Sequence, residues 1–125
     1  MMDSGTMDGQ GRSLDEIVAE RLAQTRQLFL NILGPRLEEI AHARRKVETG
    51  AIRAEDGMAE IRSVCHKIAG SAGSLGFADL GDLANEVQTV IDELRHAGRH
   101  GAEAWHVVRP IADEFYDAAQ AVLRR

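Results

Sequence analysis

Hydrophobic residues recur every three or four positions along most of the chain, which is the spacing of helices rather than of strands. Five segments show this spacing, and each is bounded by residues that start or stop a helix. The pattern predicts helices over residues 14–34, 35–49, 54–74, 78–97 and 102–123. No alternating pattern typical of a half-buried strand interrupts them. We therefore expect an all-α fold.

The predicted boundaries rest on residues with strong helix-end preferences. Ser13 and Glu16 form a capping box, so the first helix should begin at residue 14. Gly34 and Pro35 then break or kink the pattern, and Pro35 suits the first position of a second helix. Pro110 falls inside the last apolar stripe, but the apolar phase continues across it, which predicts a kink within one helix.

Short connections and one apolar face per helix are typical of an antiparallel up-and-down four-helix bundle. Because five helices are predicted, we expect an additional N-terminal helix to pack against the other four. Residues 1–12 contain three glycines, three methionines and no periodic apolar residues. They are predicted to be a disordered leader, and residues 13–125 to be the folded domain.

The composition excludes several classes of function. A chain of 125 residues with 44% hydrophobic and 28% charged residues has room for a single core. The net charge is −5 and basic residues are interspersed with acidic ones, so we expect no nucleic-acid partner. No apolar run approaches 18 residues, which predicts no membrane segment. The single cysteine, Cys65, is compatible with a reducing compartment, and we expect a cytoplasmic protein.

No common motif for a cofactor or a metal is present. The sequence lacks a Walker phosphate loop, a dinucleotide fingerprint, a zinc-protease motif and a nucleophile elbow, so we expect no ATP binding and no autonomous enzyme activity. His96 and His100 are four residues apart, but Gly98 lies between them and no cysteine or carboxylate nearby completes a ligand set. A solvated loop is the favoured interpretation, and no metal or cofactor is predicted.

One segment of the third predicted helix combines a histidine with glycines that an ordinary helix avoids. On a helical wheel the apolar stripe lies opposite His66, whereas Ala59, Gly70 and Gly73 lie within about 40° of it. Each glycine inside a helix costs about 1 kcal/mol relative to alanine, and close approach of another surface is the simplest reason for two of them. The alternative is a solvated histidine beside helix-end glycines, of which Gly76 is readily a C-cap.

An exposed imidazole is suited to carrying a phosphoryl group. It is nucleophilic while neutral near physiological pH, so it can form and release a covalent intermediate. Phosphoryl transfer depends mainly on alignment and charge stabilisation, much of which a partner's metal and basic residues can supply. A strip of small residues would let such a partner dock. The expected docking surface is made of Ala59, Ala69, Gly70 and Gly73.

The same segment resembles the signature of the histidine-containing phosphotransfer (HPt) domain family. The matching residues are His66, Ile68, Gly70, Ser71, Ala72, Leu75 and Gly76. The resemblance implies a phosphocarrier of a two-component phosphorelay, with His66 as the phosphoacceptor. It implies response-regulator receiver domains and a hybrid histidine kinase as partners, with any Mg²⁺ belonging to the receiver. We expect the carrier itself to be a monomer.

Further positions follow from the resemblance to HPt domains. These domains often place a glutamine on the next helix against the histidine's other ring nitrogen, and Gln88 occupies the expected place, with a solvated glutamine as the alternative. The family usually has lysine three residues after the histidine, where this chain has Ala69. Arg62, one turn before His66, or else Lys67, is expected to replace part of the missing charge. For each of these two, a solvated surface cation is the alternative.

Two other interpretations stay open. A helical adaptor would bind a receiver or kinase domain without carrying phosphate, and Ala69 in place of the lysine favours it. The dimerisation and phosphoacceptor region of a histidine kinase usually has an acidic residue directly after the histidine and a proline a few residues on. This chain has Lys67 after the histidine and no proline before Gly76. The adaptor is therefore the main alternative.

Overall fold

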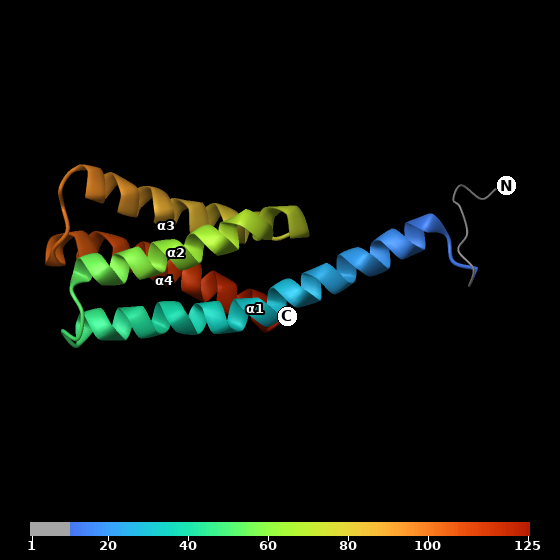
Figure 1. The fold of residues 1–125 in the computed structure, drawn as a ribbon, viewed down its shortest axis with the longest axis horizontal. Coiled ribbons are helices and arrows are strands. Elements are labelled where there is room, and N and C mark those ends of the chain that lie inside the picture. Colours follow the sequence, from blue (N-terminus) through green and yellow to red (C-terminus); the bar gives the residue numbers. More distant parts are fainter. Residues whose placement is uncertain (1–10) are drawn as a thin grey trace.

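The computed structural model describes residues 11–125, and its regular elements are all helices. Figure 1 shows a bundle in which α2 and α3 lie side by side and run in opposite directions. The predicted all-α helical bundle is confirmed. A disordered leader was predicted for residues 1–12, and residues 1–10 of it lie outside the described residues. The elements are α1 (Leu14–Glu48), α2 (Ala54–Ala72), the 3₁₀ turn η1 (Gly73–Leu75), α3 (Ala78–His96) and α4 (Ala102–Leu123).

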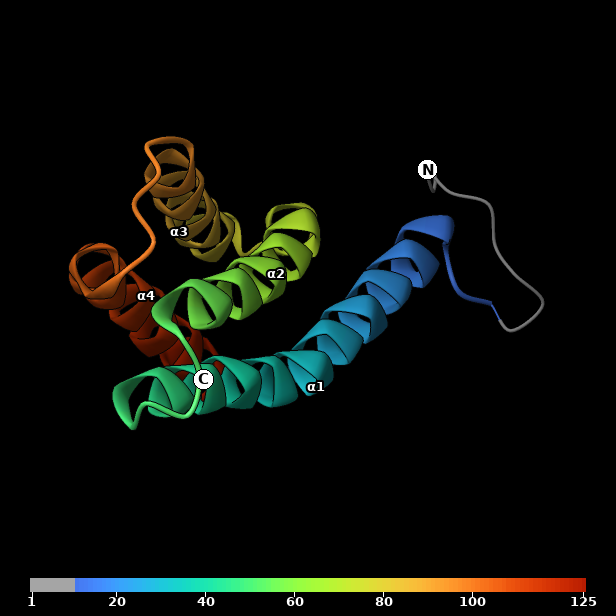
Figure 2. The ribbon, with the colours of Figure 1, turned by 60° about the vertical axis from the view of Figure 1, so that its left-hand side comes forward.

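Helix α1 is one continuous helix where the sequence predicted two. Pro35 lies inside it and removes one backbone donor, but Gly34 has no Cβ to clash with the proline ring, which lowers the cost of a helical residue before proline. Leu33 and Leu37, on either side of the pair, are both buried and hold the two parts on the same core. Figures 1 and 2 show that α1 bends along its length instead of ending. The separate helix predicted for residues 35–49 is therefore wrong.

The N-terminal turns of α1, from Leu14 to Leu22, project beyond the other helices instead of packing on them (Figures 1 and 2). Leu14, Val18 and Leu22 remain 50%, 58% and 42% exposed, and the buried stripe of α1 begins only at Phe29. The prediction of an additional N-terminal helix packed on the bundle is thus wrong. Helical periodicity identifies an apolar face, but it does not show whether another element covers that face.

Other predicted boundaries agree closely with the structure. The Ser13 hydroxyl accepts a hydrogen bond from the Glu16 backbone at 3.1 Å, and the Glu16 carboxylate accepts one from the Ser13 backbone at 3.3 Å, so the capping box starts α1 as expected. Helix α4 runs through Pro110 as a single helix over the predicted residues 102–123. Helix α2 ends two residues earlier than predicted because η1 takes up residues 73–75.

One hydrophobic core joins the four helices, and each contributes one face to it. The rings of Phe29 on α1 and Phe77, just before α3, stack with centroids 5.3 Å apart. Cys65 is completely buried in this core and has no disulfide partner. The largest side chains that are almost fully buried are those of Leu33, Leu37, Ile61, Val87, Val108 and Phe115.

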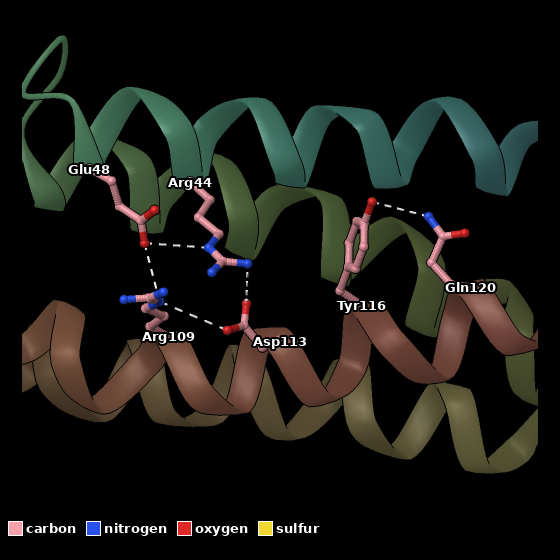
Figure 3. Close-up of polar contacts among 6 residues, drawn as sticks. All are labelled: Arg44, Glu48, Arg109, Asp113, Tyr116 and Gln120. Atoms are coloured by element: carbon pink, nitrogen blue, oxygen red, sulfur yellow. Dashed lines mark hydrogen bonds and ion pairs between the residues drawn. The ribbon is translucent and has the colours of Figure 1, made fainter.

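A polar network joins the C-terminal half of α1 to α4 (Figure 3). Arg44 contacts Asp113 at 2.9 Å, and Arg109 contacts Glu48 at 3.1 Å. These side chains are partly exposed, and such ion pairs contribute about 0–1 kcal/mol each. The network lies between α1 and α4, on helices other than the one that carries His66.

Candidate functional site

His66 is exposed on α2, as its position opposite the core stripe predicts. Its neighbours along the same face, Ala59, Gly70 and Gly73, are exposed as well. A Cβ atom added at Gly70 or Gly73 would meet no other atom within 4 Å, apart from the chain neighbours and the helix's own backbone. The surface beside the histidine is therefore low and open, so a second molecule can approach the imidazole closely.

Gln88 on α3 contacts the histidine through its side chain. The Nδ1 atom of His66 lies 3.0 Å from Oε1 of Gln88. An amide oxygen can only accept a hydrogen bond, so Nδ1 carries the proton and donates. The neutral ring then has its lone pair on Nε2, which is the nitrogen left to act as nucleophile or base. Gln88 is only 9% exposed, which restricts the positions its amide can adopt.

Asn85 orients that amide and was not identified from the sequence. The Nε2 group of Gln88 donates to Oδ1 of Asn85 at 3.1 Å, so the amide nitrogen faces Asn85 and the oxygen faces His66. The spacing of three residues between Asn85 and Gln88 places both on one side of α3, and it is the signal that could have identified the pair. The chain His66–Gln88–Asn85 thus selects one tautomer of the imidazole.

Arg62 lies one turn before His66 and is held by Asp92 on α3, a residue that the sequence analysis did not single out. Its Nε and Nη2 atoms donate to the two carboxylate oxygens of Asp92 at 2.6 and 3.0 Å. The hydrogen bond from Arg62 lowers the pKa of Asp92, and the same bond raises the pKa of Arg62. Both groups stay charged near neutral pH, so the expected cation is present beside His66 but is already paired.

Lys67 and Ala69 lie on different sides of α2. Lys67 lines a small hollow together with Ile32 and Arg36 of α1, so it stands on the side of α2 away from Gln88. Ala69 is half-buried on the side that faces α3, where its carbonyl oxygen lies 3.9 Å from a Cβ placed on Gly81. The structure therefore brings Arg62 and Gln88 to one side of His66 and Lys67 to the other.

Gly76 ends the helical segment that carries the site. Its φ of +92° is in the left-handed region, which favours glycine at this position, and it caps η1. Arg26 of α1 lies over it: its Nε donates to the carbonyl oxygen of Leu75 at 2.8 Å, and a Cβ on Gly76 would come within 2.6 Å of the guanidinium. The cap at Gly76 was expected from the sequence, whereas the contact from Arg26 was not.

The remaining histidines and the cysteine of the described residues do not form a metal site. Among residues 11–125 no group of three or more His, Cys, Asp or Glu side chains is placed to hold a metal ion. His96 interacts through Nδ1 with the backbone oxygen of Asp92 at 3.0 Å, and His100 lies in the connection before α4. Burial raises the pKa of Cys65 to about 12, so its thiol stays protonated and unreactive.

The position of the histidine suits a macromolecular partner better than a small substrate. A hollow of about 750 Å³ lies beside the start of α2, where Trp105 and Arg109 line it together with Ala54. His66 is twelve residues further along, which corresponds to about 18 Å of helix. The imidazole instead stands on an exposed face of α2.

A comparison with protein families matches residues 12–122 to the Hpt domain. The chain belongs to the Hpt domain family. The resemblance seen in the segment that begins at His66 is confirmed over nearly the whole chain. Hpt domains take part in histidine phosphotransfer within phosphorelays, as phosphocarriers and not as kinases.

Two further comparisons, with curated proteins and with solved structures, found no relative of this Hpt domain. Within the part of the Hpt domain that the structure describes, no helix combines the length and the apolar character needed to cross a membrane.

Proposed function

We propose that this Hpt domain carries a phosphoryl group on Nε2 of His66 between aspartates of response-regulator receiver domains. The observation that supports the proposal most directly is the 3.0 Å contact between Nδ1 of His66 and the Gln88 amide, on an otherwise exposed ring. This contact occupies Nδ1 and leaves the Nε2 lone pair available. The phosphoryl group would enter the relay from a hybrid histidine kinase through its receiver domain.

The transfer balances without a cofactor in the carrier. The Nε2 lone pair attacks the phosphorus of an aspartyl phosphate, the bond from phosphorus to the carboxylate oxygen breaks, and the aspartate leaves as a carboxylate. The proton on Nδ1 stays in its hydrogen bond to Gln88. In the second step a carboxylate oxygen of another receiver attacks the phosphorus, and the N–P bond breaks to restore the imidazole. Any Mg²⁺ belongs to the receiver.

The open face around His66 gives the receiver its access. Ala59, Ala69, Gly70 and Gly73 form the proposed docking surface. The absence of protein atoms above Gly70 and Gly73 supports this role, because the receiver must bring its own metal and basic residues to the phosphoryl group.

The surrounding residues have distinct roles in this proposal. Gln88 fixes the tautomer of the ring, and Arg62 supplies charge to the phosphoryl group. Lys67 is less suited than Arg62 to supply this charge, because it stands on the side of α2 toward α1. Gly76 shapes the end of the helical segment. We further propose that the domain acts as a cytoplasmic monomer.

Transfer from a radiolabelled, phosphorylated receiver domain tests the proposal. We expect acid-labile, base-stable label on the full chain, lost in His66→Gln and kept in His42→Gln, a matched control for an exposed histidine on α1. Label that persists at full level in His66→Gln would contradict the assignment. Tight receiver binding without transfer, unchanged by His66→Ala, would favour the adaptor instead.

A further inference from the structure

The pair formed by Arg62 and Asp92 has the geometry of a two-pronged guanidinium–carboxylate contact. Its two hydrogen bonds measure 2.6 and 3.0 Å, and they join α2 to α3. The Arg62 and Asp92 side chains are 33% and 37% exposed, so the pair is partly shielded and partly accessible to solvent. Two parallel bonds fix the orientation of the guanidinium plane, which a single bond does not.

This pair lies directly beside the contact between His66 and Gln88. Arg62 precedes His66 by four residues on α2, and Asp92 follows Gln88 by four residues on α3. Four residues correspond to one helical turn, or about 6 Å of rise. The two cross-links are therefore successive steps between the same antiparallel helices, and the guanidinium reaches toward α3 on the side where the imidazole also reaches.

The guanidinium still has donors to offer when it is bound to Asp92. It carries five N–H groups, and Asp92 engages the one on Nε and one on Nη2. Both N–H groups of Nη1 and the second one of Nη2 remain. A phosphoryl group carries up to about two negative charges and three acceptor oxygens, which this free edge matches.

We propose that Asp92 is a positioning residue that holds Arg62 so that the free edge of its guanidinium meets the phosphoryl group on His66. The inference rests on the proposed function of His66 as phosphoacceptor. It explains how a chain with Ala69 in place of the usual lysine keeps a cation at the phosphoryl group. Asp92 does not itself contact the phosphoryl group, and it acts on that group by holding Arg62.

The effect of Asp92→Asn on the lifetime of phosphohistidine distinguishes a positioning role of Asp92 from simple compensation of the Arg62 charge. If Asp92 only weakened the positive charge of Arg62, then Asp92→Asn would increase the net positive charge near His66 and lengthen the life of phosphohistidine. If Asp92 positions Arg62, the same change releases the guanidinium and shortens that life. The two alternatives predict opposite results from one variant.

Chemical loading of the full chain with phosphoramidate tests the inference without a receiver domain. The imidazole nitrogen attacks the phosphorus of phosphoramidate, the P–N bond of phosphoramidate breaks, and its nitrogen leaves as ammonia. The half-life of phosphohistidine is then measured as water attacks the phosphorus, the N–P bond breaks, the imidazole takes up a proton and inorganic phosphate leaves. We expect Asp92→Asn and Arg62→Gln each to shorten the half-life about two- to fivefold, the range for a partly exposed charge contact.

Further variants give the test its specificity. The double variant should decay no faster than Arg62→Gln alone, because Asp92 acts through Arg62. Arg62→Lys keeps the charge but lacks the fork, so it should also shorten the half-life. Ala69→Lys, added to Arg62→Gln, should restore part of it. In the wild type, phosphorylation should shift the Arg62 side-chain N–H resonances, and this shift should be absent in Asp92→Asn.

Asp113→Asn is the matched control. Asp113 is 34% exposed, contacts Arg44 at 2.9 Å and joins α1 to α4, so its loss also breaks an ion pair between helices. Its phosphohistidine half-life should equal that of the wild type. An unchanged or longer half-life in Asp92→Asn, or an unchanged one in Arg62→Lys, overturns the inference and leaves the proposed function intact. Failure of the wild type to load at His66 overturns both.

Discussion

Nδ1 of His66 and Oε1 of Gln88, 3.0 Å apart, mark the register in which α2 and α3 pack. One turn away the same register pairs Arg62 with Asp92, and near the other end it places Gly81 beside Gly73, whose backbone nitrogen lies 3.5 Å from a Cβ built on Gly81. Three contacts, made by α2 and its continuation in η1 with α3, thus follow one antiparallel alignment. The position of the imidazole is set by the whole helix pair and not by one local contact.

Gln88→Ala should slow phosphotransfer to His66. Loss of the amide frees the ring to rotate and to take either tautomer, which removes about one hydrogen bond, or roughly 1 kcal/mol, from the reactive arrangement. We expect a fall of about fivefold in the single-turnover rate from a phosphorylated receiver. Gln88→Glu should keep most of the rate, because a carboxylate oxygen can still accept from Nδ1.

Gln120→Ala is the control for Gln88→Ala. Gln120 also makes a side-chain contact within the bundle, donating to the Tyr116 hydroxyl at 3.1 Å (Figure 3). It is on α4 and does not contact His66. Its rate should match that of the wild type, and an equal loss in both variants would show that the effect of Gln88 is general destabilisation.

Gly70→Ala should raise stability and lower phosphotransfer. Gly70 lies within α2 with open space around it, so alanine would improve helix propensity by up to about 1 kcal/mol. The added methyl group stands on the face where we propose that a receiver docks. Urea unfolding should show a higher midpoint, while the rate of transfer from a receiver falls.

A bulkier side chain makes the Gly70 test sharper. Gly70→Gln should block receiver docking further, while phosphoramidate, a small donor, should load His66 as before. If receiver transfer stayed at the wild-type rate in Gly70→Gln, the docking surface would have to lie elsewhere.

The sequence predicted features that depend on one helix at a time. Periodicity placed α4 at its observed bounds and put His66 opposite the core, because both follow from the spacing of apolar residues along a single helix. Asn85 and Asp92 were not identified from the sequence, because their roles beside Gln88 and Arg62 depend on the register between α2 and α3. That register depends on how two surfaces fit together, which spacing in one helix does not specify.

The path of α1 shows the same limit. Gly34 and Pro35 are strong helix-ending signals, but burial of Leu33 and Leu37 on either side keeps the helix continuous. Tertiary packing outweighed the local signal. The exposed Leu14 and Val18 give the opposite case, in which a good apolar pattern is left without a covering element.

Cys65 should react only when the protein unfolds. Burial raises its pKa to about 12, whereas an unfolded cysteine has a pKa near 8.5. The thiolate is the reactive form, so a disulfide reagent at pH 8 should label native protein far more slowly than denatured protein. Labelling of the native chain at the rate of a free thiol would contradict the burial of this side chain.

The same shift makes stability depend on alkaline pH. The folded state favours the protonated thiol, so its contribution is fully present below about pH 8.5 and is lost as the pH rises from there toward 12. The free energy of unfolding should therefore fall more between pH 7 and pH 10 in the wild type than in Cys65→Ala. Equal falls in the two proteins would mean that Cys65 is not the group responsible.

Gly57→Ala should destabilise the bundle. Gly57 is buried near the start of α2, and an added Cβ would overlap Cγ2 of Val47 and lie 3.6 Å from the carbonyl oxygen of Ala43. Valine has no long flexible end that can move aside, so α1 and α2 would have to shift apart, at a cost of about 1–3 kcal/mol. Urea unfolding should show a lower midpoint than in the wild type. Gly70→Ala, a helical glycine in open space, should move the midpoint upward, and an upward shift in Gly57→Ala as well would disprove the close contact between α1 and α2.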